Sequence, residues 1–206
     1  MSSAKAYKIV TPRLVIRCYT VADTPLLQKS INESLEHLKP WMPWAWHEPE
    51  SLEAKTLRVQ RFWEDFHTGK DYIFGIFNLA ETEVLGSTGL HARVEENARE
   101  IGYWVNINHA NKGIITEAVK ALTKVGFEIE GLNRIEIKCD VDNKISALIP
   151  EKCGFVLKEI AKARLKDEKG NDRDAMIWEM TKEHYFQNPF NDIWLTAYDT
   201  AGEEIK

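Results

Sequence analysis

At 206 residues the chain predicts a single domain that is long enough to bury a full hydrophobic core. Its 44% hydrophobic and 29% charged residues are typical of a soluble globular protein, and its net charge of −5 argues against a sequence-independent nucleic-acid binder, which needs a basic surface. No run of residues is long enough to span a membrane, and the opening MSSAKAYKIV lacks the apolar segment of a signal peptide, so we expect a cytoplasmic protein.

Cysteine and histidine usage indicates neither disulfides nor a metal. Cys18, Cys139 and Cys153 are far apart and odd in number, which suits buried thiols in a reducing compartment. The six histidines are scattered, and neither a Cys-x-x-Cys nor a His-Glu-x-x-His pattern occurs. We therefore predict no metal site.

The first half of the chain predicts a strand, two helices and a strand pair. Ser51 is the expected N-cap of the second helix, because its hydroxyl can accept a hydrogen bond from the first turn. In chain order the elements are a strand at Leu14–Tyr19, helices at Val21–Leu38 and Ser51–Thr68, and strands at Tyr72–Asn78 and Glu83–Val94.

The second half predicts a strand–helix–strand crossover, a short helix and a closing strand pair. This order favours an α+β fold with one mixed, mostly antiparallel sheet and a central βαβ crossover flanked by helices. We expect one domain over residues 1–186 and a C-terminal extension over 187–206, whose Trp194 and Tyr198 pack either on the same domain or against a second copy in a homodimer. The elements are a strand at Glu100–Val105, a helix from Gly113 to about Ile129, a strand at Arg134–Cys139, a helix at Ile145–Lys152, and strands at Phe155–Ala163 and Asp174–Met180.

The segment Ile101–Thr116 carries the strongest functional signal. A strand there leads through a lysine–glycine loop into an amphipathic helix, and such a helix start presents unpaired N–H groups and the positive end of the helix dipole. Together they suit a pyrophosphate, although a glycine before a buried helix also serves as a simple tight turn. A P-loop nucleotide binder is disfavoured, because the Gly-x-x-x-x-Gly-Lys-Ser/Thr pattern is missing.

Several motifs in the same order resemble the GNAT superfamily of acetyltransferases, and within it the RimJ/RimL-type N-acetyltransferases. The resemblance implies the GNAT fold and acetyl-CoA as cosubstrate. The motifs are TPRLVIR at Thr11–Arg17, HLKPWMPWAW at His37–Trp46, EIGYWV at Glu100–Val105, NKGIITEA at Asn111–Ala118, and DNKIS with EKCGF within Asp142–Phe155.

The resemblance also implies which residues hold acetyl-CoA. The Val105 backbone is expected to pair with the pantetheine arm, and Asn143 to bind that arm or to cap the following helix. Ala110 and Ile115 depart from the polar and small residues usual in the family's loop, but backbone donors remain. The expected pyrophosphate loop consists of Ala110, Asn111, Lys112, Gly113, Ile114, Ile115 and Thr116.

Acetyl transfer to an amine needs a neutral amine, and a proton donor for the thiolate helps. The position where many GNAT enzymes carry a catalytic tyrosine is Pro150 here, whereas Ser146, one turn earlier, matches a serine assigned this role in RimL-like proteins. Glu100 is the candidate base, acting through water; the alternative is an exposed carboxylate at the edge of its strand. His91 and His109 are expected to be structural.

The aromatic loop and the region after Gly154–Phe155 bear on the acceptor. Trp41, Trp44 and Trp46 between prolines predict a wall of the acceptor groove or a buried lid. Leu165 stands where RimL-like enzymes carry a carboxylate, so a ribosomal acceptor is not assured. We expect an N-acetyltransferase for protein or peptide N-termini; the alternatives are a small-amine acetyltransferase, for an antibiotic, polyamine or amino acid, and a non-catalytic CoA-binding protein.

Overall fold

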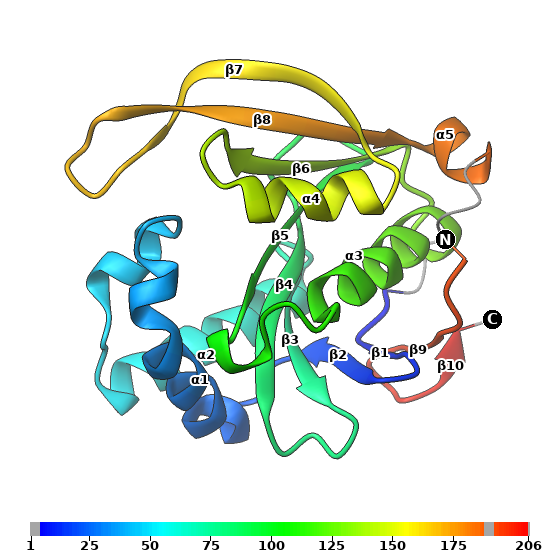
Figure 1. Ribbon diagram of the computed structural model, residues 1–206. Helices are drawn as coiled ribbons and strands as arrows, with labels where there is room; N and C mark the ends of the chain where they lie inside the picture. Colours follow the sequence, from blue (N-terminus) through cyan, green and yellow to red (C-terminus); the bar gives the residue numbers. More distant parts are fainter. Residues whose placement is uncertain (1–4, 188–191, 206) are drawn as a thin grey trace.

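The computed structural model describes residues 5–187 and 192–205. The predicted domain and its extension therefore include residues 1–4, 188–191 and 206, which lie outside the described part. The described strands form one sheet in the order β10-β9-β1-β2-β3-β4-β5-β6-β8-β7 (Figure 1). The strands are β1 (Lys8–Val10), β2 (Leu14–Cys18), β3 (Ile73–Asn78), β4 (Val84–His91), β5 (Ala98–Val105), β6 (Arg134–Asp140), β7 (Val156–Lys166), β8 (Asp172–Thr181), β9 (Thr196–Tyr198) and β10 (Glu204–Ile205).

Helices cover both faces of this sheet, and the two faces follow from strand alternation. On β2, Leu14 and Ile16 pack in the core under the third helix, whereas Val15 between them packs with Leu27 and Val59 of the first two helices. The helices are α1 (Thr24–Leu38), α2 (Leu52–Thr68), α3 (Ile114–Lys124), α4 (Lys144–Lys152) and α5 (Lys182–Gln187), with a π-helical turn at Val125–Ile129 after α3.

The start of α2 is as predicted, whereas the start of α1 differs. The Ser51 hydroxyl accepts a hydrogen bond from the Ala54 N–H at 3.2 Å, and α2 ends at Gly69, whose φ of 72° suits glycine. The helix expected from Val21 begins instead as a 3₁₀ turn at Val21–Asp23 and becomes α-helical from Thr24, with Pro25 in the first turn.

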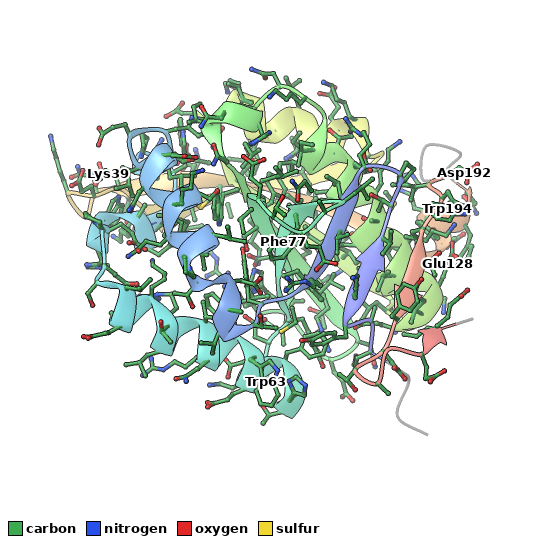
Figure 2. The ribbon with its side chains drawn as sticks, turned by 90° about the horizontal axis from the view of Figure 1, so that it is seen from below. Lys39, Trp63, Phe77, Glu128, Asp192 and Trp194 are labelled. Carbon is green, nitrogen blue, oxygen red and sulfur yellow. The ribbon has the colours of Figure 1, made fainter. Side chains whose placement is uncertain are left out.

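The sequence analysis missed the strands at one edge of the sheet. β9 pairs with β1 antiparallel, with Ala197 opposite Ile9, so this part of the tail packs as an extra element of the same sheet. Trp194 precedes β9 and is 64% exposed; Figure 2 shows it on the opposite side of the molecule from Lys39. Strands of two or three residues carry too little alternation to be read from sequence.

The closing hairpin is longer than predicted. β7 reaches Lys166 and β8 begins at Asp172, because a turn closed by Asp167 and Asn171 continues the pairing beyond the alternating apolar residues. The hairpin arches over the end of the molecule where α1 finishes (Figure 1). In the described part of the chain, no helix combines the length and apolarity of a membrane span, and no three potential metal ligands converge.

Candidate active site

The site begins as a gap between the one parallel strand pair of the described sheet. β5 and β6 pair from Ala98 opposite Arg134 to Ile101 opposite Ile137 and then separate. β5 stays paired with β4 as far as Val105, so the backbone of residues 102–105 keeps one unpaired edge. An extended amide-bearing ligand can add to such an edge as a strand does.

A cavity of about 620 Å³ opens beside this edge, between β5, α3 and α4. Nearly all of the residues predicted to hold the cofactor line it, although they come from segments up to 38 positions apart (105 to 143). The lining includes Val105, Ala110, Asn111, Gly113, Ile114, Ile115, Thr116 and Asn143.

The loop before α3 has the backbone needed to bind an anion. Gly113 has φ of 74°, a left-handed conformation that starts the helix with its first N–H groups free of intrahelical partners. A Cβ there would lie 3.4 Å from the nearest atom, Nη2 of Arg13, so the dihedral angle rather than space selects glycine. The amides at residues 114–116 and the helix dipole therefore suit an anion, and the pyrophosphate site stays a prediction.

The segment from Thr11 to Arg13 holds this loop in place. Arg13 donates from Nη1 to the Lys112 carbonyl at 2.9 Å and from Nε to Glu117 at 2.5 Å, and the Thr11 hydroxyl donates to the same carboxylate at 2.6 Å. Lys112 itself does not line the cavity; its ammonium donates to the Asn108 carbonyl at 2.7 Å. The loop is thus held by Thr11 and Arg13, which lie just before β2, rather than by its own Lys112.

A second cavity, of about 450 Å³, lies on the side of α1 and α2. It meets the first at the gap between β5 and β6, so a ligand in one can reach a ligand in the other through the sheet. The residues that line both cavities are Trp41, Met42, Tyr103, Trp104, Asn143 and Ser146.

Ser146 stands at this junction in a hydrogen-bonded pair with Tyr103. Its Oγ donates to the Tyr103 hydroxyl at 3.2 Å, and that hydroxyl donates to the Ser146 carbonyl at 3.0 Å. Asn143 caps α4 by accepting from the Ser146 N–H at 3.1 Å, so the capping alternative is realised while Asn143 also lines both cavities. Burial raises the pKa of Tyr103, so its phenol stays protonated at neutral pH.

Sequence reasoning missed Tyr103 as a site residue. The signal was available, because Tyr103 is the second residue of the GYWV run at the end of β5 that separates from β6. Only the fold shows that it reaches the α4 serine, 43 positions later.

The three predicted tryptophans occupy different places. Trp44 lines only the second cavity and packs against Trp104 with ring centroids 6.0 Å apart, whereas Trp41 lines both cavities. Trp46 lines neither; its indole N–H donates to the Lys39 carbonyl at 2.8 Å and so fixes the loop.

Arg173 of β8 ties the aromatic loop to the sheet. Its Nε donates to Asp140 at 2.7 Å, its Nη1 donates to the Pro40 carbonyl at 3.0 Å, and its guanidinium lies 5.2 Å from the Trp41 ring centroid. Leu165 of the same hairpin lines the second cavity, as expected of a position that bears on the acceptor.

Glu100, the predicted base, also lines the second cavity. Its carboxylate is paired with Lys138 at 2.9 Å and with Arg93 at 3.6 Å, and only 13% of the side chain is exposed. Both partners reach it from outside β5, so Glu100 is not the exposed strand-edge carboxylate of the alternative, and its role as a base stays a prediction.

Comparisons with known proteins match this geometry. Residues 13–156 match the family model described as the acetyltransferase (GNAT) domain. In Bacillus subtilis (strain 168), the "Putative ribosomal N-acetyltransferase YdaF" is 30% identical over 75% of this chain and 83% of its own length, and the "Probable N-acetyltransferase YjcK" is 30% identical over 56% and 65%. The crystal structure of RimL, a ribosomal-protein α-N-acetyltransferase in complex with coenzyme A, superposes with a TM-score of 0.77 at 22% identity, over 85% of this chain and 97% of that one. The predicted α+β fold is confirmed.

Proposed function

Because the chain belongs to the acetyltransferase (GNAT) family, we propose that it transfers the acetyl group of acetyl-CoA to the N-terminal amine of a protein or peptide. The resemblance to RimJ/RimL-type enzymes is confirmed, as is the prediction of an acetyl-CoA-dependent N-acetyltransferase. The matched segment covers 65% of YjcK, so the acceptor is argued from the site rather than carried over whole.

The observation that carries the proposal is the meeting of two cavities at a break in the sheet. Acetyl transfer requires a thioester and an amine to approach from separate pockets, and the shared residues Tyr103, Trp104 and Ser146 mark where they meet. The cosubstrate's pyrophosphate belongs at the amides of residues 113–116, and its pantetheine arm along the free edge of β5 near Val105. Both assignments use backbone groups that have no partner within the described helices and strands: the first N–H groups of α3 and the unpaired edge of β5.

At the junction, we assign Ser146 as the donor of a proton to the leaving CoA thiolate. Its hydroxyl lies on the first turn of α4, one helical turn before Pro150, where the usual tyrosine is absent. Before attack the acceptor ammonium loses one proton, and Glu100 remains the carboxylate candidate for receiving it, through water. The neutral amine nitrogen then attacks the thioester carbon and the C–S bond breaks. Ser146 gives its proton to sulfur and regains the second proton, which the nitrogen loses after the attack.

The acceptor class rests on two features of the second cavity. The aromatic wall of Trp44 and Trp104 suits the first residues of an extended peptide, and the name of YdaF points to ribosomal proteins. Leu165 favours the second candidate, a small amine, because an apolar wall replaces the expected carboxylate. A cytoplasmic location and a homodimer stay predictions.

The decisive experiment measures CoA thiol release from acetyl-CoA over a panel of N-terminal peptides and small amines. We expect turnover on peptides with a free N-terminus, a mass increase of one acetyl group, and none on the same peptides with a blocked N-terminus. Turnover on polyamines or amino acids alone would establish the second candidate. Acetyl-CoA binding without turnover on any amine would establish a non-catalytic protein.

A further inference from the structure

His91 and Asp71 form a pair in the acceptor cavity that the proposed chemistry has not used. His91 is the last residue of β4 and is 8% exposed, yet it lines that cavity. Its Nδ1 lies 2.9 Å from the Asp71 carboxylate, whose other oxygen accepts from the Ala92 N–H at 3.2 Å. Since a carboxylate only accepts, Nδ1 carries the ring hydrogen and Nε2 carries the lone pair.

Two glycines make room for the imidazole on the sheet. Gly89 and Gly102 face each other across β4 and β5. A Cβ built on Gly89 would lie 2.8 Å from Nε2 of His91, and one built on Gly102 would lie 3.1 Å from it. The ring therefore lies over this glycine pair, and a side chain at either position would displace it.

The basic nitrogen is both free and directed along the cavity. Within residues 5–187 and 192–205, Nε2 of His91 has no hydrogen-bond partner, whereas both oxygens of the alternative base, Glu100, are engaged by Lys138 and Arg93. His91 lines the same cavity as the junction residues Tyr103, Trp104 and Ser146, so a water in that cavity can relay a proton between Nε2 and an amine bound there.

We propose that His91, oriented by Asp71, is the general base that takes the proton from the acceptor ammonium. This inference rests on the proposed function. Nε2 of His91 accepts one proton from the ammonium, directly or through a water, and the neutral amine then attacks the thioester carbon. The imidazolium later releases that proton to solvent, while the thiolate is protonated as described above, so protons and charge balance.

Asp71 is a positioning residue in this scheme. Burial alone would raise the pKa of its carboxyl, but the hydrogen bonds and charge of His91, with backbone N–H groups, outweigh burial and lower it. The other charged groups that line the cavity near the ring are Glu100 from β5, Lys138 from β6 and Arg93 after β4.

The test is the pH dependence of kcat/KM for acetyl transfer to a peptide amine. We expect His91→Gln to lower kcat/KM at pH 7 by on the order of 10²-fold, with little change in acetyl-CoA affinity. The deficit should shrink toward pH 9, where the α-amine, with an ordinary pKa of about 8, is neutral without help. Asp71→Asn should lower kcat more than it raises KM. His67→Gln is the matched control, because that exposed histidine stacks on Trp63 at the outer surface of α2 (Figure 2) and should leave activity unchanged.

A second variant protects the test against misfolding. His91→Ala opens a space over Gly89 and Gly102, and added imidazole should restore part of its activity. The assignment of His91 would be overturned if His91→Gln kept the wild-type kcat/KM and pH profile. It would also be overturned if the fall of kcat/KM at low pH disappeared in Glu100→Gln and not in His91→Gln. Failure of the wild-type protein to acetylate any amine would instead overturn the proposed function.

Discussion

The Ser146 hydroxyl and the Tyr103 phenol lie 3.2 Å apart where the cofactor and acceptor cavities meet, joining β5 to the first turn of α4. Pro150, one helical turn after Ser146 on α4, stands where the family resemblance leads us to expect a tyrosine. The Ser146 hydroxyl donates to the phenol oxygen, and the phenol donates to the Ser146 carbonyl, so the phenol fixes the position of the serine hydroxyl at the junction.

Removing the serine hydroxyl should slow the chemical step. Ser146→Ala is expected to lower kcat by on the order of 10²-fold with little change in acetyl-CoA affinity, because the proton is needed only in the transition state. Steady-state kinetics and calorimetry check this. A near-wild-type kcat on a good acceptor would mean that water supplies the proton.

Tyr103→Phe tests whether the two hydroxyls act together. We expect a smaller loss in kcat, about 10-fold, because Ser146 remains but loses its phenol partner. In the double variant the losses should be non-additive, since residues in one hydrogen-bond network couple energetically. Additive effects in this double-mutant cycle would show that the hydroxyls work independently.

The anion site can be tested with two glycines that share the left-handed backbone conformation. Gly113 and Gly131 have φ of 74° and 70°, and a Cβ at either meets nothing closer than 3.4 Å. Alanine in that conformation costs roughly 1–2 kcal/mol, so Gly113→Ala should weaken acetyl-CoA binding up to about 10-fold as the loop shifts. Gly131→Ala, away from the site, should lower the stability of the protein without changing its affinity for acetyl-CoA. If calorimetry gives the two variants equal affinities for acetyl-CoA, the assignment of the loop is refuted.

The aromatic wall should affect the acceptor and not the cosubstrate. Trp44 lines only the acceptor cavity, so Trp44→Ala is expected to raise the acceptor KM about 10-fold or more while leaving the KM for acetyl-CoA nearly unchanged. Trp63→Ala, on the outer surface of α2, is the control for loss of a tryptophan. Equal changes in both KM values would favour a packing role for Trp44.

Acid should destabilise the ion pairs that Glu50 makes with Lys55 and Arg58, two residues that line the acceptor cavity. The hydrogen bond from Arg58, aided by Lys55 and opposed by burial, lowers the pKa of Glu50 to about 2. Because the folded pKa lies below the unfolded value of about 4.3, the stabilisation is complete above that value and is lost as pH falls toward 2. Urea unfolding of Glu50→Gln should show a flatter decline between about pH 5 and pH 2, while Glu53→Gln, at an exposed position in the first turn of α2, should follow the wild type.

The sequence by itself determined the elements whose apolar residues repeat over several turns or strand residues. α2 with its Ser51 cap, α3 behind Gly113 and the alternating strands on either side were predicted because burial on one face leaves a period in the sequence. The anion loop was predicted for a similar reason: a helix start after a glycine has its donors whatever the rest of the fold does.

Only the tertiary structure decided which distant side chains meet. Tyr103 with Ser146, His91 with Asp71, and Arg173 with Pro40 are contacts between separate elements, and no local period records them. The edge strands β9 and β10 gain their conformation from pairing with β1 and each other rather than from their own few residues. The separation of β5 from β6, which opens the site, likewise depends on register and twist across the whole sheet, because each strand alone would pair along its full length.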